Sequence, residues 1–184
     1  MKTADFSDTT ADHLVCFAHG KESGPWGHKI THLAKIARKR DFAVISPDYR
    51  HTQDPAARVA HLLALRPRAR KLVLVGSSMG GYVSAMACTA LRPTALFLMA
   101  PALYFPGWDT EPEAVPALCS VVHGWRDSVV PHERGLRFAQ RHRAALHLLD
   151  AEHGLTECLD MIGLLFDELL TRTLAVAPAL DDGP

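Results

Sequence analysis

The chain has 184 residues, a balanced charge with 20 basic and 20 acidic side chains, and 48% apolar residues. This composition is typical of one globular domain and excludes a disordered chain, while the lack of a basic stripe argues against nucleic acid as a partner. No apolar stretch reaches the roughly 18 residues that a membrane span needs.

The N-terminal residues 1–12 are polar, contain no apolar signal-peptide core and predict a flexible lead. The four cysteines are widely spaced, which fits buried thiols in a reducing compartment and predicts a cytoplasmic location. We expect a single domain over residues 13–175, followed by a frayed tail over 176–184.

Six short apolar runs, each bounded by Gly, Pro, Asp or His, recur along the chain and predict strands. Because these runs are nearly continuous rather than alternating, the strands are expected to be covered on both faces, as in a parallel sheet. The runs span residues 14–20, 42–48, 71–77, 95–101, 117–124 and 145–154.

Helical patterns lie between the strands. Residues 28–39 carry one apolar stripe, and residues 54–66 begin with Asp54 as the N-cap and Pro55 at the first helical position. The alternation predicts an α/β fold with a doubly wound, mostly parallel sheet of about six strands. A Pro- and aromatic-rich link over 101–116 breaks this rhythm. Further helices are expected over 79–91, 132–143 and 156–176, the last with Thr156 as its N-cap.

The segment Gly76-Ser77-Ser78-Met79-Gly80 follows a predicted strand and opens a predicted helix, which is the setting of a G-x-S-x-G nucleophile turn. A serine on such a tight turn has a positive φ, and side chains two residues to either side would collide in the turn. Only Ser78 has glycine at both of these positions, so Ser78 is the candidate nucleophile. A Gly-rich turn that merely packs a helix on a strand is the alternative, whereas a phosphate-binding loop would need a Gly-Lys-[Ser/Thr] that is missing here.

A serine hydroxyl needs a base and an acid that orients the base, and both are expected at later strand ends. Asp127 and His153 follow the fifth and sixth predicted strands in the required order. Asp127 as a simple turn cap is an open alternative. Asp150 is the rival acid, but it ends a strand; His123 and His132 are the rival bases, but the first should point into packing and the second starts a helix.

The oxyanion of an acyl-transfer intermediate needs two N–H donors. One is expected from the amide of Met79, directly after the nucleophile. The other is expected from the loop after the first strand, at Lys21, with Gly20 as the alternate.

These motifs resemble the α/β-hydrolase superfamily over about residues 13–172. Within that superfamily the chain is similar to small, lidless bacterial serine esterases of the dienelactone-hydrolase-like and carboxylesterase-like group, although dienelactone hydrolases proper use cysteine where Ser78 stands here. The resemblance implies a compact fold without a cap domain, a Ser78–Asp127–His153 triad, hydrolysis of a small carboxylic ester through an acyl-enzyme, and no metal or organic cofactor. The residues on which this resemblance rests are His19-Gly20, Gly76–Gly81, His123-Gly124-Trp125-Arg126-Asp127 with Val130-Pro131, and His153-Gly154.

Aromatic side chains near predicted strand ends are candidates for lining an apolar acyl pocket, and ordinary core packing is equally open for them. They are Trp26, Tyr104, Phe105, Trp108 and Trp125.

Several charged and metal-binding residue types also lie near predicted strand ends. Lys21, Arg50 and Arg126 could favour anionic substrates, although a solvated surface role fits them better. His28 and His32 are four residues apart on a helix but lack a third ligand, so no metal is expected.

The expected partner is a small-molecule ester, and the sequence leaves a homodimer open. A thioesterase or an acyltransferase would use the same triad, so these activities are alternatives. A non-catalytic binding or scaffold protein on the same fold is an alternative of another class, because fold alone does not establish function.

Overall fold

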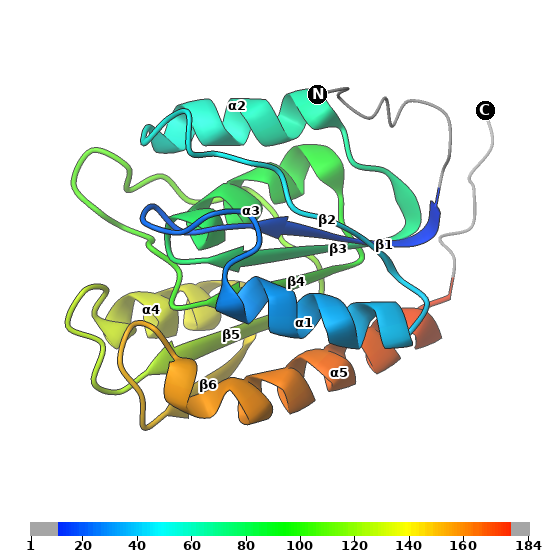
Figure 1. The fold of residues 1–184 in the computed structure, drawn as a ribbon. Helices are drawn as coiled ribbons and strands as arrows, with labels where there is room; N and C mark the ends of the chain where they lie inside the picture. The colour runs from blue at the N-terminus through cyan, green and yellow to red at the C-terminus, as the bar shows by residue number, and fades with distance from the viewer. Residues whose placement is uncertain (1–10, 178–184) are drawn as a thin grey trace.

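The computed structural model describes residues 11–177, in which a six-stranded sheet lies between two layers of helices (Figure 1). The strands are β1 (Ala11–Ala18), β2 (Ala43–Ile45), β3 (Ala69–Ser77), β4 (Ala95–Met99), β5 (Leu118–Gly124) and β6 (Ala145–Leu149). Their order is β2-β1-β3-β4-β5-β6, and every neighbouring pair is parallel. The predicted doubly wound parallel sheet is therefore confirmed.

The helices are α1 (His28–Lys39), α2 (Pro55–Leu65), α3 (Met79–Leu91), α4 (His132–His142) and α5 (Leu159–Ala175). The carboxylate of Asp54 accepts the amide of Ala56 at 3.0 Å, so the predicted N-cap of α2 is present. The predicted cap at Thr156 is wrong. Leu155 has φ 55 and is fully buried, a short 3₁₀ helix (Thr156–Cys158) follows it, and the Thr156 hydroxyl donates to Glu157 instead.

The nearly continuous apolar runs are explained by burial on both faces of the sheet. On β3, Val73 and Val75 join the core formed with α1 and α5, whereas Leu72 and Leu74 join the core formed with α2, α3 and α4. Successive side chains of a strand point to opposite faces, so a strand covered twice needs apolar residues at every position.

The connection over residues 100–117, between β4 and β5, contains no helix. Phe105 and Trp108 pair in an isolated bridge and stack with their ring centroids 5.3 Å apart, and Trp108 meets the ring of Tyr82 on α3 edge-on. The hydroxyl groups of Tyr82 and Thr110 are 3.0 Å apart. This connection is thus pinned to the body of the protein, and residues 11–177 contain no cap domain.

Residues 1–10 of the predicted N-terminal lead lie outside the described residues, and residues 11 and 12 already belong to β1. The chain leaves α5 at Ala175, and the tail beyond residue 177 likewise lies outside them. No helix within residues 11–177 combines the length and the apolar character that crossing a membrane requires.

Candidate active site

Ser78 stands at the junction between β3 and α3, at the carboxyl edge that the parallel strands share. Its φ of 54° and ψ of −120° are unfavourable for an L-residue, and the turn is held by its amide donating to the carbonyl of Met99 at 2.9 Å. A methyl group at Gly76 would lie 2.6 Å from the Cα of Gly81, so this glycine is required as predicted. At Gly80 the reason differs from the prediction, because the methyl group would overlap the carbonyl of Ala18 at the end of β1 rather than the turn itself.

Three polar side chains form one hydrogen-bonded path at this edge. The hydroxyl of Ser78 lies 3.0 Å from Nε2 of His153, and Nδ1 of His153 lies 2.8 Å from Oδ2 of Asp127. Because the carboxylate can only accept, Nδ1 carries the proton, which leaves Nε2 free to accept from the serine. The structure therefore brings together the three side chains that the sequence analysis selected. His153 lies 75 residues after Ser78 and 26 residues after Asp127 in the sequence.

The side chain of Asp127 is fully buried and receives several N–H donors. Its Oδ1 accepts the amides of Val129 at 2.9 Å and Val130 at 2.8 Å, and its Oδ2 lies 3.2 Å from Nε2 of His123. Burial alone would raise the pKa of Asp127, but the hydrogen bonds from Val130 and His153 outweigh it and hold this pKa below its ordinary value. Asp127 thus caps its turn and orients His153 at the same time.

The rival acid and the rival bases form no hydrogen bond with Ser78 or His153. Asp150 is 2.7 Å from Nε of Arg126 at the surface, and His132 begins α4. His123 is buried at the end of β5, where its Nε2 donates to the carbonyl of Val130 at 2.9 Å, and burial lowers its pKa. Its contact with Asp127 was not expected from the sequence.

The loop after β1 lies against Ser78. A methyl group at Gly20 would approach Cβ of Ser78 to 3.4 Å, and Gly20, Lys21 and Met79 all line one cavity with Ser78. Within residues 11–177, the amides of Lys21 and Met79 have no hydrogen-bond acceptor. The predicted oxyanion donors are thus close to Ser78 and uncommitted.

This cavity, called the Ser78 cavity below, has a volume of about 730 Å³ and is mostly apolar. Phe105 and Trp108 line it. The other three aromatics do not: Trp26 and Trp125 are 49% and 54% exposed, and the guanidinium of Arg137 covers the ring of Tyr104 at 4.0 Å.

Of the three predicted cations, only Lys21 lines the Ser78 cavity. Arg50 pairs with Asp48 at 2.6 Å, and Arg126 pairs with acidic residues around Asp150, so neither is available to an anionic substrate. The cation that sequence reasoning missed is Lys29, in the first turn of α1, which donates to the carbonyl of Gly154 at 2.8 Å. Burial lowers the pKa of Lys29, and no local pattern indicates this contact across 125 residues.

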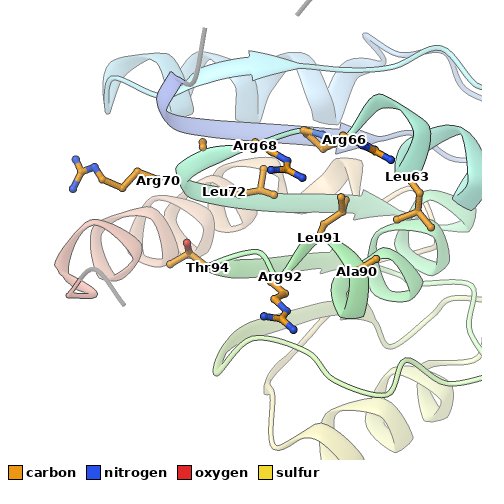
Figure 2. A pocket seen from close by; sticks show the side chains of 11 residues that line it. Leu63, Arg66, Arg68, Arg70, Leu72, Ala90, Leu91, Arg92 and Thr94 are labelled. Carbon is orange, nitrogen blue, oxygen red and sulfur yellow. The ribbon is translucent and has the colours of Figure 1, made fainter. Parts of the chain in front are cut away.

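A second cavity of about 450 Å³ lies at the opposite end of the sheet, where β3 and β4 begin (Figure 2). It is bordered by Arg66, Arg68, Arg70 and Arg92, and we call it the arginine cavity. Its lining contains no serine, cysteine, histidine or carboxylate. Figure 2 shows Arg70 and Arg92 pointing away from one another, so their guanidinium groups do not converge on one point. The Ser78 cavity is therefore the candidate active site.

Comparison with known proteins agrees with this geometry. The model of the alpha/beta hydrolase family matches residues 17–184, whereas comparison with curated proteins gives no match. A protein from Xanthomonas campestris pv. campestris assigned to the alpha/beta hydrolase superfamily is 32% identical, with a TM-score of 0.80 over 87% of this chain and 99% of its own.

Two more distant structures share the fold. XC6422 from Xanthomonas campestris, an α/β serine hydrolase without a lid, is 22% identical, with a TM-score of 0.69 over 94% of this chain and 87% of its own. Est1E from Butyrivibrio proteoclasticus is 16% identical, with a TM-score of 0.77 over 92% of this chain and 91% of its own. With the family match over most of the sequence and the fold described above, the chain belongs to the α/β-hydrolase family.

Proposed function

We propose that the chain is a serine hydrolase that cleaves small carboxylic esters through an acyl-enzyme on Ser78. The observation that carries this proposal is the unbroken hydrogen-bonded path from the hydroxyl of Ser78 through His153 to Asp127. The path begins at a residue with positive φ and opens into a mostly apolar cavity. A protein that used the fold only for binding would have no need of this strained and fully connected arrangement.

The proposed reaction proceeds in two halves. Oγ of Ser78 attacks the ester carbonyl carbon while Nε2 of His153 takes the hydroxyl proton, and Asp127 stabilises the imidazolium that forms. The tetrahedral intermediate collapses, the C–O bond to the leaving group breaks, and His153 returns the proton to the departing alcohol. Water then attacks the acyl-enzyme with His153 as the base, which releases the carboxylic acid and restores Ser78.

The negative charge of both intermediates is placed on the former carbonyl oxygen. We assign its two donors to the amides of Met79 and Lys21, which are uncommitted and beside Ser78. Removal of one such donor typically slows catalysis by about 10²–10³-fold.

The substrate assignment rests on the lining of the Ser78 cavity. Phe105 and Trp108 supply apolar surface on the side of the 100–117 connection, which favours an apolar acyl group. A thioester would react through the same steps, so esters are the first class to test.

The proposal is tested with a fluorophosphonate probe and p-nitrophenyl butyrate. We expect the wild-type protein and a Ser77→Ala variant to be labelled and to hydrolyse the ester, because Ser77 belongs to β3 and takes no part in the path. Ser78→Ala should be unlabelled and inactive, with an unchanged far-ultraviolet circular dichroism spectrum. Labelling that persists in Ser78→Ala would refute the assignment of the nucleophile.

A further inference from the structure

Arg58, on the inner side of α2, is a buried cation without a carboxylate partner. Its side chain is 0% exposed, and no acidic oxygen of residues 11–177 lies within the 4.0 Å of an ion pair. Burial lowers the pKa of Arg58. Placing an unpaired charge in the interior is costly, and an apolar side chain of similar volume would often be at least as stable there. The position of Arg58 therefore calls for a reason beyond packing.

The partners of Arg58 are carbonyl groups of the main chain. Its Nη1 donates to the carbonyls of Gly20 at 3.2 Å and His19 at 3.3 Å, and its Nε donates to the carbonyl of Thr52 at 2.9 Å. Two of these three acceptors belong to the loop that follows β1. A single buried guanidinium on α2 thus fixes the loop that lies against Ser78.

His19 adds a second donor to the same loop. Its Nε2 accepts the amide of Tyr49 at 2.9 Å, so the ring proton is on Nδ1, which donates to the carbonyl of Gly20 at 2.7 Å. His19 is fully buried, and burial lowers its pKa, which keeps this neutral form. The carbonyl of Gly20 is therefore held by two donors from the protein interior, neither of which lines the Ser78 cavity.

The orientation of this carbonyl determines the orientation of the next amide. Residues 11–177 contain no cis peptide bond, and in a planar trans peptide the N–H points opposite to the C=O. Since the carbonyl of Gly20 points inward to Arg58, the N–H of Lys21 points outward, on the side where both residues line the Ser78 cavity. This geometry favours Lys21 over Gly20 as the second oxyanion donor.

We propose that Arg58 is a positioning residue for the oxyanion site: it holds the Gly20–Lys21 peptide so that the Lys21 N–H faces the oxyanion formed at Ser78. The inference rests on the proposed function. The cation also polarises the peptide, because a hydrogen bond to a carbonyl strengthens the donor at the other end of the same amide. Arg58 touches no substrate and acts only through this peptide.

The test compares Arg58→Met, which keeps length and apolar bulk, with Arg58→Lys, which keeps the charge. The number of active sites is first titrated with the fluorophosphonate probe, and kcat per active site and KM are then measured with p-nitrophenyl butyrate. We expect Arg58→Met to lower kcat by about 10- to 100-fold with KM within about twofold, because the contact matters only once the oxyanion forms. Affinity for an alkyl boronic acid, which forms a tetrahedral anion on serine, should fall by the same factor, and Arg58→Lys should recover part of the loss.

Arg66→Met is the matched control, since Arg66 ends the same helix, is exposed and borders the arginine cavity (Figure 2). It should leave kcat and KM unchanged. Lys21→Pro removes the donor itself, and Arg58→Met in that background should have little further effect, because the two changes act on one hydrogen bond.

Several outcomes would overturn the inference. Arg58→Met with a wild-type kcat per titrated site would do so, as would fully additive losses in the double variant. If Arg58→Met fails to fold, Arg58→Lys decides alone: a folded Arg58→Lys variant with unchanged kcat and unchanged boronate affinity refutes the positioning role. A wild-type protein that is neither labelled nor active would instead refute the proposed function.

Discussion

At the residue scale, the side chains around Ser78 divide into two groups by what they touch. Phe105 and Trp108 present aromatic rings to the Ser78 cavity, whereas Lys29, which also lines this cavity, and Arg58, which does not, donate to main-chain carbonyls of the loops that carry His153 and Gly20. Under the proposed function, the first group sets the space that an acyl chain can occupy. The second group keeps the loops in the positions that the proposed reaction needs.

The role of Trp108 in this space is testable by chain-length preference. Trp108→Ala should enlarge the Ser78 cavity, so the ratio of kcat/KM for p-nitrophenyl octanoate to that for the butyrate should rise by about tenfold, the scale on which pocket methylenes discriminate. Trp26→Ala is the control, because Trp26 is 49% exposed and outside the cavity, and its ratio should stay at the wild-type value. A Trp108→Ala variant that folds and keeps the wild-type ratio would show that the acyl chain lies elsewhere.

At the scale of elements, the position of Ser78 depends on how closely α3 approaches β1. A methyl group at Gly80 would overlap the carbonyl of Ala18 and come within 2.7 Å of the carbonyl of His19. Both contacts are with backbone atoms, which have little freedom to move. The first turn of α3 can therefore reach its place beside β1 only with glycine at this position.

Gly80→Ala is accordingly expected to reduce the free energy of unfolding by about 3 kcal/mol, the upper range for overpacking a tight core. Gly24→Ala is the control, since its nearest neighbour would be Cδ of Arg50 at 3.9 Å, an ordinary contact. Urea denaturation followed by circular dichroism measures both. Equal stability of the two variants would mean that α3 can move away from β1 without loss.

The sequence predicts most elements because local patterns and tertiary packing agree. The helices over 28–39 and 79–91 have the predicted bounds, and strands buried on both faces leave continuous apolar runs. The edge strand β2, which pairs with β1 alone, is shorter than its predicted range over 42–48. The capping of α5 was mispredicted, since the left-handed Leu155 that precedes it has no signature in the sequence.

The candidate site likewise contains residues that the sequence predicts and residues that it does not. The sequence selects Ser78, Asp127 and His153 as candidates because each follows a strand, and parallel strands bring their carboxyl ends to one edge, where the three side chains lie in contact. Arg58 and Lys29 are not found, because their partners are carbonyl groups 38 and 125 residues away, which carry no side-chain signal. Which aromatics line the cavity depends on the path of the 100–117 connection, and composition does not determine that path.

At the scale of the whole molecule, buried histidines make stability depend on pH. Burial holds the pKa values of His19 and His123 below the ordinary value of 6.5. Below pH 6.5 these two histidines therefore bind protons in the unfolded chain while they remain neutral in the folded protein. The free energy of unfolding that the neutral rings contribute is lost as pH falls toward their pKa values in the folded protein. The lowered pKa of Asp127 acts in the same direction at lower pH, where its hydrogen bonds are lost on protonation.

The melting temperature is thus expected to fall steadily as the buffer changes from about pH 7 to about pH 5. His123→Gln, which retains a donor near Nε2 but cannot titrate, should show a shallower fall. The exposed His28→Gln variant is its control and should follow the wild-type curve. Calorimetric melting curves across this range measure the effect, and a flat profile for the wild type would contradict it.

The strand order has a consequence for how the protein acquires activity during synthesis. Ser78 follows β3, Asp127 follows β5, and His153 follows β6, the last strand to be made and the outer strand on its side of the sheet. Parallel neighbours meet only through crossovers, so their pairing is long-range and slow. A nascent chain that has already formed the Ser78 turn still lacks the proposed base, His153, until β6 docks. Under the proposed function, ester turnover is therefore expected only from chains that have completed the sheet, and copies with an undocked final strand are expected to be inactive.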